Sequence, residues 1–305
     1  MWLNDRLHVG GGVTLRTYKS GNKRSFRDAA RLYSYLPEKD EWIEKPINTP
    51  TYYFALAVYH SQLVIASGCE YQGQDKVGPH TNKVWTILPE SGEKREDIPP
   101  MNIKRHSATG ISTGDHLVIA GGLGVNGVEL NSVEVYNGHE WSPTRELPRA
   151  CWHMKCTLYK GCLYLMGGVG QGQKVYYIEI EHLIANCTTA SDLTTSSGLE
   201  EKTWKKITSI PHERSALAAF GGSLVAIGGG DLFSPTSKMY AYAPGPAGNS
   251  PLQLWIPIAS GNLPTNLISI CAVTLPSGEL MSIGGEKGQE WSDKVFKASL
   301  HKGKN

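Results

Sequence analysis

Cysteine is scarce in this chain. Only six cysteines occur among 305 residues, and these are Cys69, Cys151, Cys156, Cys162, Cys187 and Cys271. Small secreted domains that depend on disulfides carry a much higher proportion of cysteine. The sequence therefore excludes a scaffold built on disulfides, and it favours reduced thiols in a cytoplasmic protein.

An excess of charge of one sign and a long apolar run are also missing. The chain has 30 Lys and Arg against 28 Asp and Glu, which gives a net charge of +2. This balance argues against a dedicated nucleic-acid binder. The sequence contains no run of 18 apolar residues, and Met1 to Arg6 lack the apolar stretch of a signal peptide. We therefore expect no nucleic-acid partner and no membrane association.

The familiar motifs of nucleotide binding and catalysis are absent too. The sequence has no GxSxG, HExxH or GxxxxGK[ST] motif. The glycines Gly122, Gly124 and Gly127 match the dinucleotide fingerprint, but that fingerprint must open a helix. The residues that follow, 128–136, alternate as a strand does, so we expect no nucleotide and no other cofactor.

Glycine, by contrast, is abundant, with 34 residues. Many belong to a motif that occurs six times, a Leu followed by three residues and a Gly-Gly pair. The motif begins at Leu7, Leu63, Leu117, Leu163, Leu224 and Leu280, and only the second copy departs, with Ser67 in place of the first Gly. Its last glycines are separated by 56, 54, 46, 61 and 56 residues. Such self-similarity at a fixed period indicates a repeat architecture.

The rest of each unit is ordered in the same way. An aromatic residue follows the glycines, a Trp comes next in four units, and then a Pro. The aromatic residues are Tyr35, Trp85, Tyr136, Tyr177, Tyr242 and Phe296, and the tryptophans are Trp42, Trp141, Trp204 and Trp255. Short β-branched and aromatic runs separated by turn residues predict strands. Each unit therefore predicts four antiparallel strands, a, b, c and d, with the glycine pair at the end of strand b and the Trp on strand d.

These six units resemble the kelch repeat, and the resemblance covers nearly the whole chain. It implies an all-β fold, a six-bladed kelch-type β-propeller with four-stranded antiparallel blades, in a single domain over residues 1–305. The blades are expected near 1–44, 52–97, 105–145, 152–207, 214–258 and 267–300. The tryptophan of strand d is expected to pack between neighbouring blades.

Both ends of the repeat array are short. Residues 1–3 align with the end of strand a, and few residues remain after strand c of the sixth unit. We therefore expect the first and last blades to be incomplete, and the chain to be a segment of a longer protein or a truncated gene product. Two expanded c–d loops, 181–202 and 244–251, have the composition of solvated insertions.

The best metal candidates by spacing are Cys151, His153, Cys156 and Cys162. If 151–158 is a strand, Cys151 and His153 share one face while Cys156 points to the other. Tetrahedral zinc sites use tighter Cys pairs. We therefore expect small core cysteines and no metal.

The kelch resemblance implies a binding face. In kelch proteins that bind peptides, the d–a and b–c loops lie together on one face, so residues just before strand a and just after the glycine pair converge. The expected partner-binding residues are Tyr52, Arg105, His106, Trp152 and Arg214 before strand a, and Tyr71, Asn126, Gln171, Phe233 and Lys287 after the glycines. Aromatic residues and Arg are enriched at binding hot spots. We expect Arg105 and Arg214 to project into a shared pocket for a carboxylate-bearing peptide.

Three functions follow from the resemblance. The first is a protein-interaction module without catalytic residues, which binds a protein or an acidic peptide and could serve as the substrate-recognition part of a ubiquitin ligase adaptor. The second is an actin or cytoskeletal scaffold. The third is a sugar-modifying kelch enzyme, such as a sialic acid mutarotase. A basic stretch from Arg16 to Arg31 in the first b–c loop is either a solvated loop or another acidic-peptide site.

Overall fold

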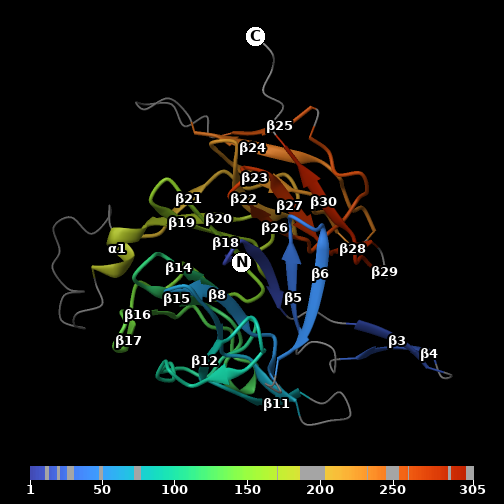
Figure 1. Cartoon of the computed structure of the whole chain (residues 1–305). Coiled ribbons are helices and arrows are strands. Elements are labelled where there is room, and N and C mark those ends of the chain that lie inside the picture. The colour runs from blue at the N-terminus through green and yellow to red at the C-terminus, as the bar shows by residue number, and fades with distance from the viewer. Residues whose placement is uncertain are drawn as a thin grey trace. The chain divides into compact units, whose positions relative to one another are not determined.

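The computed structural model covers the whole chain (Figure 1). It describes residues 1–10, 14–18, 21–25, 31–47, 51–71, 77–169, 171–185, 203–231, 233–244, 254–259, 261–287 and 290–299. The chain divides into two compact units. Unit 1 consists of residues 1–153 and 181–202, and unit 2 of residues 154–180 and 203–305.

Unit 1 contains three four-stranded antiparallel sheets. The first has the order β1 (Trp2–Leu3), β2 (Arg6–Gly10), β5 (Arg31–Leu36) and β6 (Glu41–Pro46). The second is β8 (Ala55–Tyr59), β9 (Gln62–Ala66), β12 (Val84–Ile87) and β13 (Lys94–Arg95). The third is β14 (Thr109–Ser112), β15 (Leu117–Ala120), β16 (Val133–Tyr136) and β17 (Trp141–Pro143). A small sheet joins β7 (Thr51–Tyr52), β10 (Cys69–Tyr71) and β11 (Val77–His80).

Unit 2 repeats the same design. Its first sheet is β18 (Lys155–Tyr159), β19 (Cys162–Met166), β20 (Val175–Glu179) and β21 (Lys205–Ile207). The next is β22 (Ala216–Phe220), β23 (Ser223–Ile227), β24 (Met239–Ala243) and β25 (Leu254–Pro257). The last sheet has three strands among the described residues, β26 (Cys271–Thr274), β27 (Leu280–Ile283) and β30 (Val295–Ala298). The short strands β28 (Glu286–Lys287) and β29 (Glu290–Trp291) form a separate pair.

The glycine pairs end strand b in a left-handed backbone conformation. Gly121 and Gly122 have φ of +63° and +103°, and Gly228 and Gly229 have +61° and +99°. Ser67, the residue that departs from the motif, adopts the same conformation at +64°. A side chain at Gly122 would place its Cβ 2.6 Å from the backbone oxygen of His106, so both conformation and space favour glycine there.

The tryptophans of strand d link neighbouring sheets within each unit. In unit 1, Trp141 packs against Tyr136 and donates its indole N–H to the carbonyl of Pro99, which precedes the third sheet, at 2.8 Å. In unit 2, Trp255 donates to the carbonyl of Thr208 at 2.9 Å. A buried tryptophan needs apolar contacts for its ring and a hydrogen-bond acceptor for its indole N–H, and both tryptophans have them.

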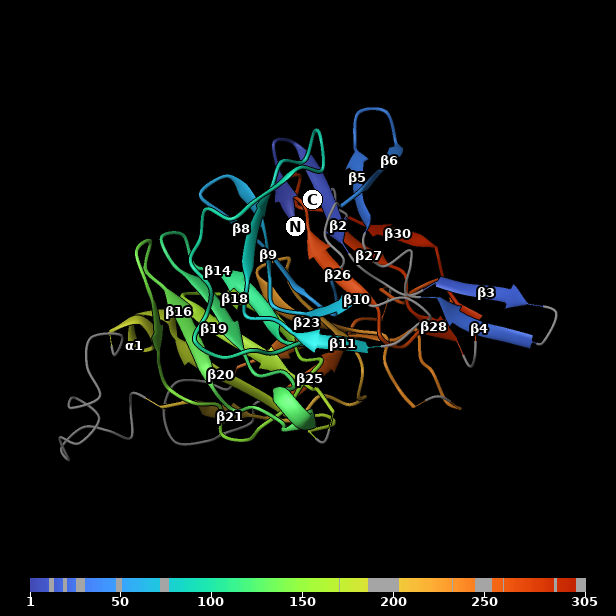
Figure 2. The same cartoon turned by 90° about the horizontal axis from the view of Figure 1, so that it is seen from below.

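The basic stretch of the first b–c loop contains a hairpin rather than an irregular loop. Strands β3 (Thr14–Tyr18) and β4 (Gly21–Ser25) pair with each other and extend away from the sheet of β2 and β5 (Figure 2). Alternating Thr14, Arg16 and Tyr18 are compatible with a strand, and Gly21 follows the turn. The side chains of this hairpin lie outside the described part, so their role as an acidic-peptide site stays a prediction.

The structure confirms the predicted all-β class. Within the described residues, the helices are α1 (Ile180–Ile184) and the short 3-10 helix η2 (Val125–Gly127). Neither combines the length and apolar character that a membrane crossing demands. Each of the six repeats forms its own sheet, while the closed six-bladed arrangement, its incomplete ends and the expected blade boundaries stay predictions. The expected insertions at 181–202 and 244–251 lie outside the described residues from 186 and from 245 onwards, while residues 181–184 of the first belong to α1.

Candidate functional site

The d–a and b–c loops meet through backbone hydrogen bonds in both units. In unit 1, His106 before β14 and Leu123 after the glycine pair exchange two hydrogen bonds, of 2.9 and 2.8 Å. In unit 2, Ile268 before β26 and Glu286 do the same at 3.0 and 2.9 Å. The two loop types that the sequence predicted to converge therefore lie side by side in these two sheets.

One position of the d–a loop has the same left-handed conformation in five repeats. These residues are Tyr53, Ser107, His153, Arg214 and Ser269, with φ between +54° and +58°. Within unit 1, the N–H of Ser107 donates to the carbonyl of Tyr53 at 2.7 Å, and that of His153 donates to Ser107 at 3.0 Å. Within unit 2, Ser269 donates to Arg214 at 2.9 Å. Each of these three bonds fixes one d–a loop to the next d–a loop within its unit.

Aromatic rings gather on these loops in unit 1. Tyr53 lies 5.7 Å from His106 and 5.8 Å from His153, measured between ring centroids. Trp152 contacts His153 at 4.5 Å, and its indole N–H donates to Glu129 of a b–c loop at 3.3 Å. We call these four rings, Tyr53, His106, Trp152 and His153, the aromatic loop cluster. Burial, together with the neighbouring His80 and His153, lowers the pKa of His106 to about 4, so this ring is neutral near pH 7.

The sequence predicted two members of the aromatic loop cluster, His106 and Trp152, and missed Tyr53 and His153. A signal for the missed residues exists in the repeat. Both lie ten residues before the motif leucine of their sheets, Leu63 and Leu163, at the position whose backbone is left-handed.

The position of Arg105 contradicts the expected pocket on the binding face. Its side chain is fully buried, with an exposed fraction of 0%, and its Nη2 lies 2.6 Å from Oε1 of Glu134. Nη1 also donates to the carbonyls of Gly121 and Ser132. The guanidinium is enclosed and paired inside the third sheet, so the expectation that Arg105 projects towards a partner is wrong.

Arg214 does not occupy the same repeat position as Arg105. Ser112 pairs with the motif leucine Leu117, and Ala219 pairs with Leu224, which is the same offset of five residues. The a–b turns of the two sheets therefore have the same length, and Arg214 does not align with Arg105. Arg214 corresponds to Ser107, ten residues before its leucine, and its side chain is exposed.

The remaining predicted residues divide by exposure. Tyr52 and Gln171 are buried, with exposed fractions of 2% and 8%, so their predicted place on an open face is also corrected. Asn126, Phe233 and Lys287 are exposed, and Phe233 reaches 95%. The side chain of Tyr71 lies outside the described part of the structure.

Metal-binding atoms gather where the sequence did not indicate them. Among the described residues, Cys69, His80 and His106 bring one ligand atom each to within 4.8 Å of one another. The candidates from spacing, Cys151, His153, Cys156 and Cys162, form no group of three or more in that part of the chain.

Unit 2 also contains a cavity of about 780 Å³. It is lined mainly by apolar residues of the last two sheets, including Phe220, Met239, Leu263 and Phe296. Three of these also belong to the core cluster that packs the two sheets together, with Phe296 against it. The lining is that of sheet packing, and it offers few polar groups to orient a substrate.

Comparison with known proteins agrees with the repeat pattern. No protein-family model matches the chain. A curated protein, Kelch-like protein 36 from Bos taurus, is 27% identical to it over 165 residues, which is 53% of this chain. This similarity supports membership of the kelch-repeat family. The matched region spans 25% of the length of the bovine protein.

Three features recur in several of the sheets. The glycine pair, the strand-c aromatic residue and the strand-d tryptophan stabilise these sheets, since each is held by backbone conformation or by packing inside one unit. The similarity to a kelch-like protein points to a protein-interaction domain.

Proposed function

We propose that the chain is a protein-interaction module that binds a partner protein or peptide through its d–a and b–c loops. The observation that carries this proposal is the pairing of the two loop types, seen in the reciprocal hydrogen bonds of His106 with Leu123 and of Ile268 with Glu286. Loops held on a rigid sheet scaffold are common places for recognition residues.

The side chains on these loops support the proposal. Val125 and Val128 in the b–c loop of the third sheet are 56% and 58% exposed. The same loop carries Glu129, which accepts the indole N–H of Trp152. In unit 2, Phe233 is 95% exposed on a b–c loop. Large apolar and aromatic side chains in solvent are costly unless a partner covers them, and they are typical anchors of interfaces.

Charge favours an acidic partner for unit 2. Arg214 and Lys287 are both exposed, one on a d–a loop and the other on a b–c loop. A guanidinium binds a carboxylate through two parallel hydrogen bonds. With Arg105 enclosed, Arg214 becomes the arginine that we propose for carboxylate recognition. In the cell, such a face would serve the substrate-recognition part of a cytoplasmic ubiquitin ligase adaptor.

The test starts with capture of partners from a cell lysate by the tagged chain, identified by mass spectrometry. Binding of the purified partner is then measured for the chain, for Trp152→Ala with Val128→Ser, and for Phe233→Ala with Arg214→Ala. The matched control is Ile256→Ser, because Ile256 is 51% exposed on β25, a strand d rather than a loop.

We expect at least one loop variant to lose ten-fold or more in affinity, about 1.4 kcal/mol, while the control binds as the parent does. Equal affinity of all variants would refute the loop face. Co-sedimentation with filamentous actin at comparable affinity, unaffected by the loop changes, would favour the cytoskeletal scaffold instead.

A further inference from the structure

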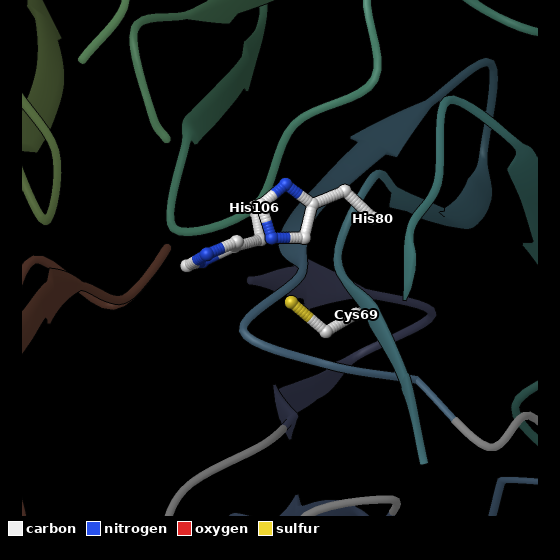
Figure 3. A group of neighbouring side chains, drawn as sticks. All are labelled: Cys69, His80 and His106. Atoms are coloured by element: carbon white, nitrogen blue, oxygen red, sulfur yellow. The ribbon is translucent and has the colours of Figure 1, made fainter. Parts of the chain in front are cut away.

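Three potential metal ligands converge in unit 1 from two neighbouring sheets. Cys69 and His80 lie on β10 and β11 in the b–c loop of the second sheet, where they are directly opposite each other across the antiparallel pair. His106 comes from the d–a loop that leads into β14. Figure 3 shows the Cys69 sulfur and the two imidazole rings turned towards a common space. Their ligand atoms all lie within 4.8 Å of one another.

The backbone holds these three residues in a closed triangle. The N–H of Gly68 donates to the carbonyl of Arg105 at 2.9 Å, Thr81 donates to Gly68 at 2.9 Å, and Arg105 donates to Thr81 at 3.2 Å. Each corner is the chain neighbour of one ligand, so the triangle fixes the positions of all three. The buried pair of Arg105 with Glu134 anchors it further. A frame that exists before the ion arrives lowers the cost of binding.

The ring nitrogens are available as ligands. Nδ1 of His106 lies 2.9 Å from the hydroxyl oxygen of Ser107, which leaves Nε2 as the nitrogen open to an ion. This division of the ring, with one nitrogen on a metal and the other on a hydrogen-bond partner, is typical of ligating histidines. Nδ1 of His80 is shielded from solvent and makes no hydrogen bond with any described residue. A shielded nitrogen without a partner calls for an explanation, and an unseen ion is one of the recognised ones.

The donor set selects the kind of ion. One thiolate and two imidazoles suit zinc and similar transition-metal ions, while Mg²⁺ and Ca²⁺ require oxygen ligands. In a tetrahedral zinc site, ligand bonds of 2.0–2.3 Å place the donor atoms about 3.3–3.8 Å apart. The separations here, all within 4.8 Å, exceed this range by at most about 1 Å. We propose that Cys69, His80 and His106 bind a zinc ion that joins the second and third sheets at their loop side.

The protonation states of the rings agree with this site. Burial lowers the pKa of His80 as well as that of His106, so both rings are neutral near pH 7, the form that ligates metals. Burial raises the pKa of the Cys69 thiol to about 12, so the ion must displace its proton. Three protein ligands leave the fourth tetrahedral position for water or for a group from outside the chain.

The experiment uses the full chain, stripped with a chelator and dialysed. Zn²⁺ is titrated in by calorimetry, and Co²⁺ is added separately because a cobalt–thiolate bond gives a charge-transfer band near the ultraviolet. The variants are Cys69→Ser and His80→Gln. The matched controls are Cys156→Ser, a partly buried cysteine outside the site, and Mg²⁺ in place of Zn²⁺.

We expect one Zn²⁺ per chain, a rise in Tm on zinc addition, and no effect of Mg²⁺. The cobalt–thiolate band should vanish in Cys69→Ser and persist in Cys156→Ser. His80→Gln keeps a side-chain amide that can replace the ring in its hydrogen bond with the backbone of Gly124, so it should fold as the parent does and lose ten-fold or more in zinc affinity. Absence of zinc binding by the parent chain, a cobalt spectrum without the thiolate band, or unchanged affinity in folded His80→Gln would each overturn the site. Loss of partner binding by the loop variants leaves these readouts unchanged, so the two proposals fail separately.

Discussion

Arg105 and Glu134 form an ion pair that is sealed inside the third sheet of unit 1. Nη2 and Oε1 lie 2.6 Å apart, and the side chains are 0% and 1% exposed. Glu134 also accepts the backbone N–H groups of Asn102 and Ile103, so both charges have several partners. The ion pair fixes the d–a loop to strand β16. The pair therefore lies beneath the proposed binding face and is not part of it.

Removal of one member of this pair should destabilise the protein strongly. Arg105→Ala leaves a buried carboxylate without its counter-charge, and a loss of about 3–5 kcal/mol in the free energy of unfolding is expected for such a change. Urea unfolding provides the measurement. The control is Arg214→Ala, which removes an exposed arginine and should stay within about 0.5 kcal/mol of the parent. Equal stability of Arg105→Ala and the parent would show that the pair does not form.

The misplacement of Arg105 shows where sequence reasoning failed at the site. Its position, twelve residues before the motif leucine, correctly put it in a d–a loop. The sequence could not reveal that Glu134, 29 residues later, pairs with it, because the direction of a loop side chain depends on a long-range contact. The metal-binding group was missed for a similar reason. Cys69, His80 and His106 have no regular spacing, and only the pairing of β10 with β11 brings the first two together.

The second glycine of the motif should be intolerant of any side chain. In Gly122→Ala, the new Cβ would lie 2.6 Å from the backbone oxygen of His106, at a φ of +103°. Strain and clash together should cost about 1–3 kcal/mol. Gly114→Ala is the matched control, because Gly114 has a φ of +95° and open space around it. Chemical denaturation should rank Gly122→Ala as the less stable of the two, and the reverse order would contradict a steric role.

The strand-d tryptophans should contribute through their indole N–H as well as their area. Trp141→Phe removes the donor to the carbonyl of Pro99 and part of a buried ring, so we expect a loss of about 1–3 kcal/mol. Trp42→Phe serves as the control, since Trp42 packs on Tyr35 in the same manner but is 37% exposed. Thermal melts of the two variants are compared, and a larger fall in Tm for Trp42→Phe would argue against this link between sheets.

The fold was more predictable than the site because its signals are local and repeated. The glycine pair has a left-handed backbone in every copy that the structure describes, and even Ser67 adopts it, since the surrounding sheet is the same. The tryptophan of strand d lies opposite the strand-c aromatic residue in register, as for Tyr136 with Trp141 and Tyr242 with Trp255. The hairpin of β3 and β4 was not predicted, because it lies in a loop between motifs. No repeated pattern indicates the structure of that segment.

The buried histidine of β2 should make the stability of unit 1 depend on pH. His8 is 0% exposed, and its Nε2–H donates to the carbonyl of Leu3 at 3.3 Å while Nδ1 accepts from the hydroxyl of Ser34 at 2.9 Å. Burial lowers the pKa of His8, the chain's amino terminus and Arg6 act in the same direction, and the Leu3 carbonyl and Glu90 oppose them.

A lowered pKa means that the unfolded chain takes up a proton at His8 more readily than the folded chain does. The contribution of neutral His8 to the free energy of unfolding is therefore fully present above the pKa of His8 in the unfolded chain, about 6.5. This contribution is lost as the pH falls towards the pKa of His8 in the folded chain. Urea unfolding between pH 7.5 and 5.5, with a chelator present throughout, measures this loss. His8→Gln keeps one donor and one acceptor without titrating, so its stability should fall less steeply over the same range. Because the other histidines titrate equally in both proteins, the difference between the two slopes belongs to His8, and parallel slopes would show that His8 is not held neutral by burial.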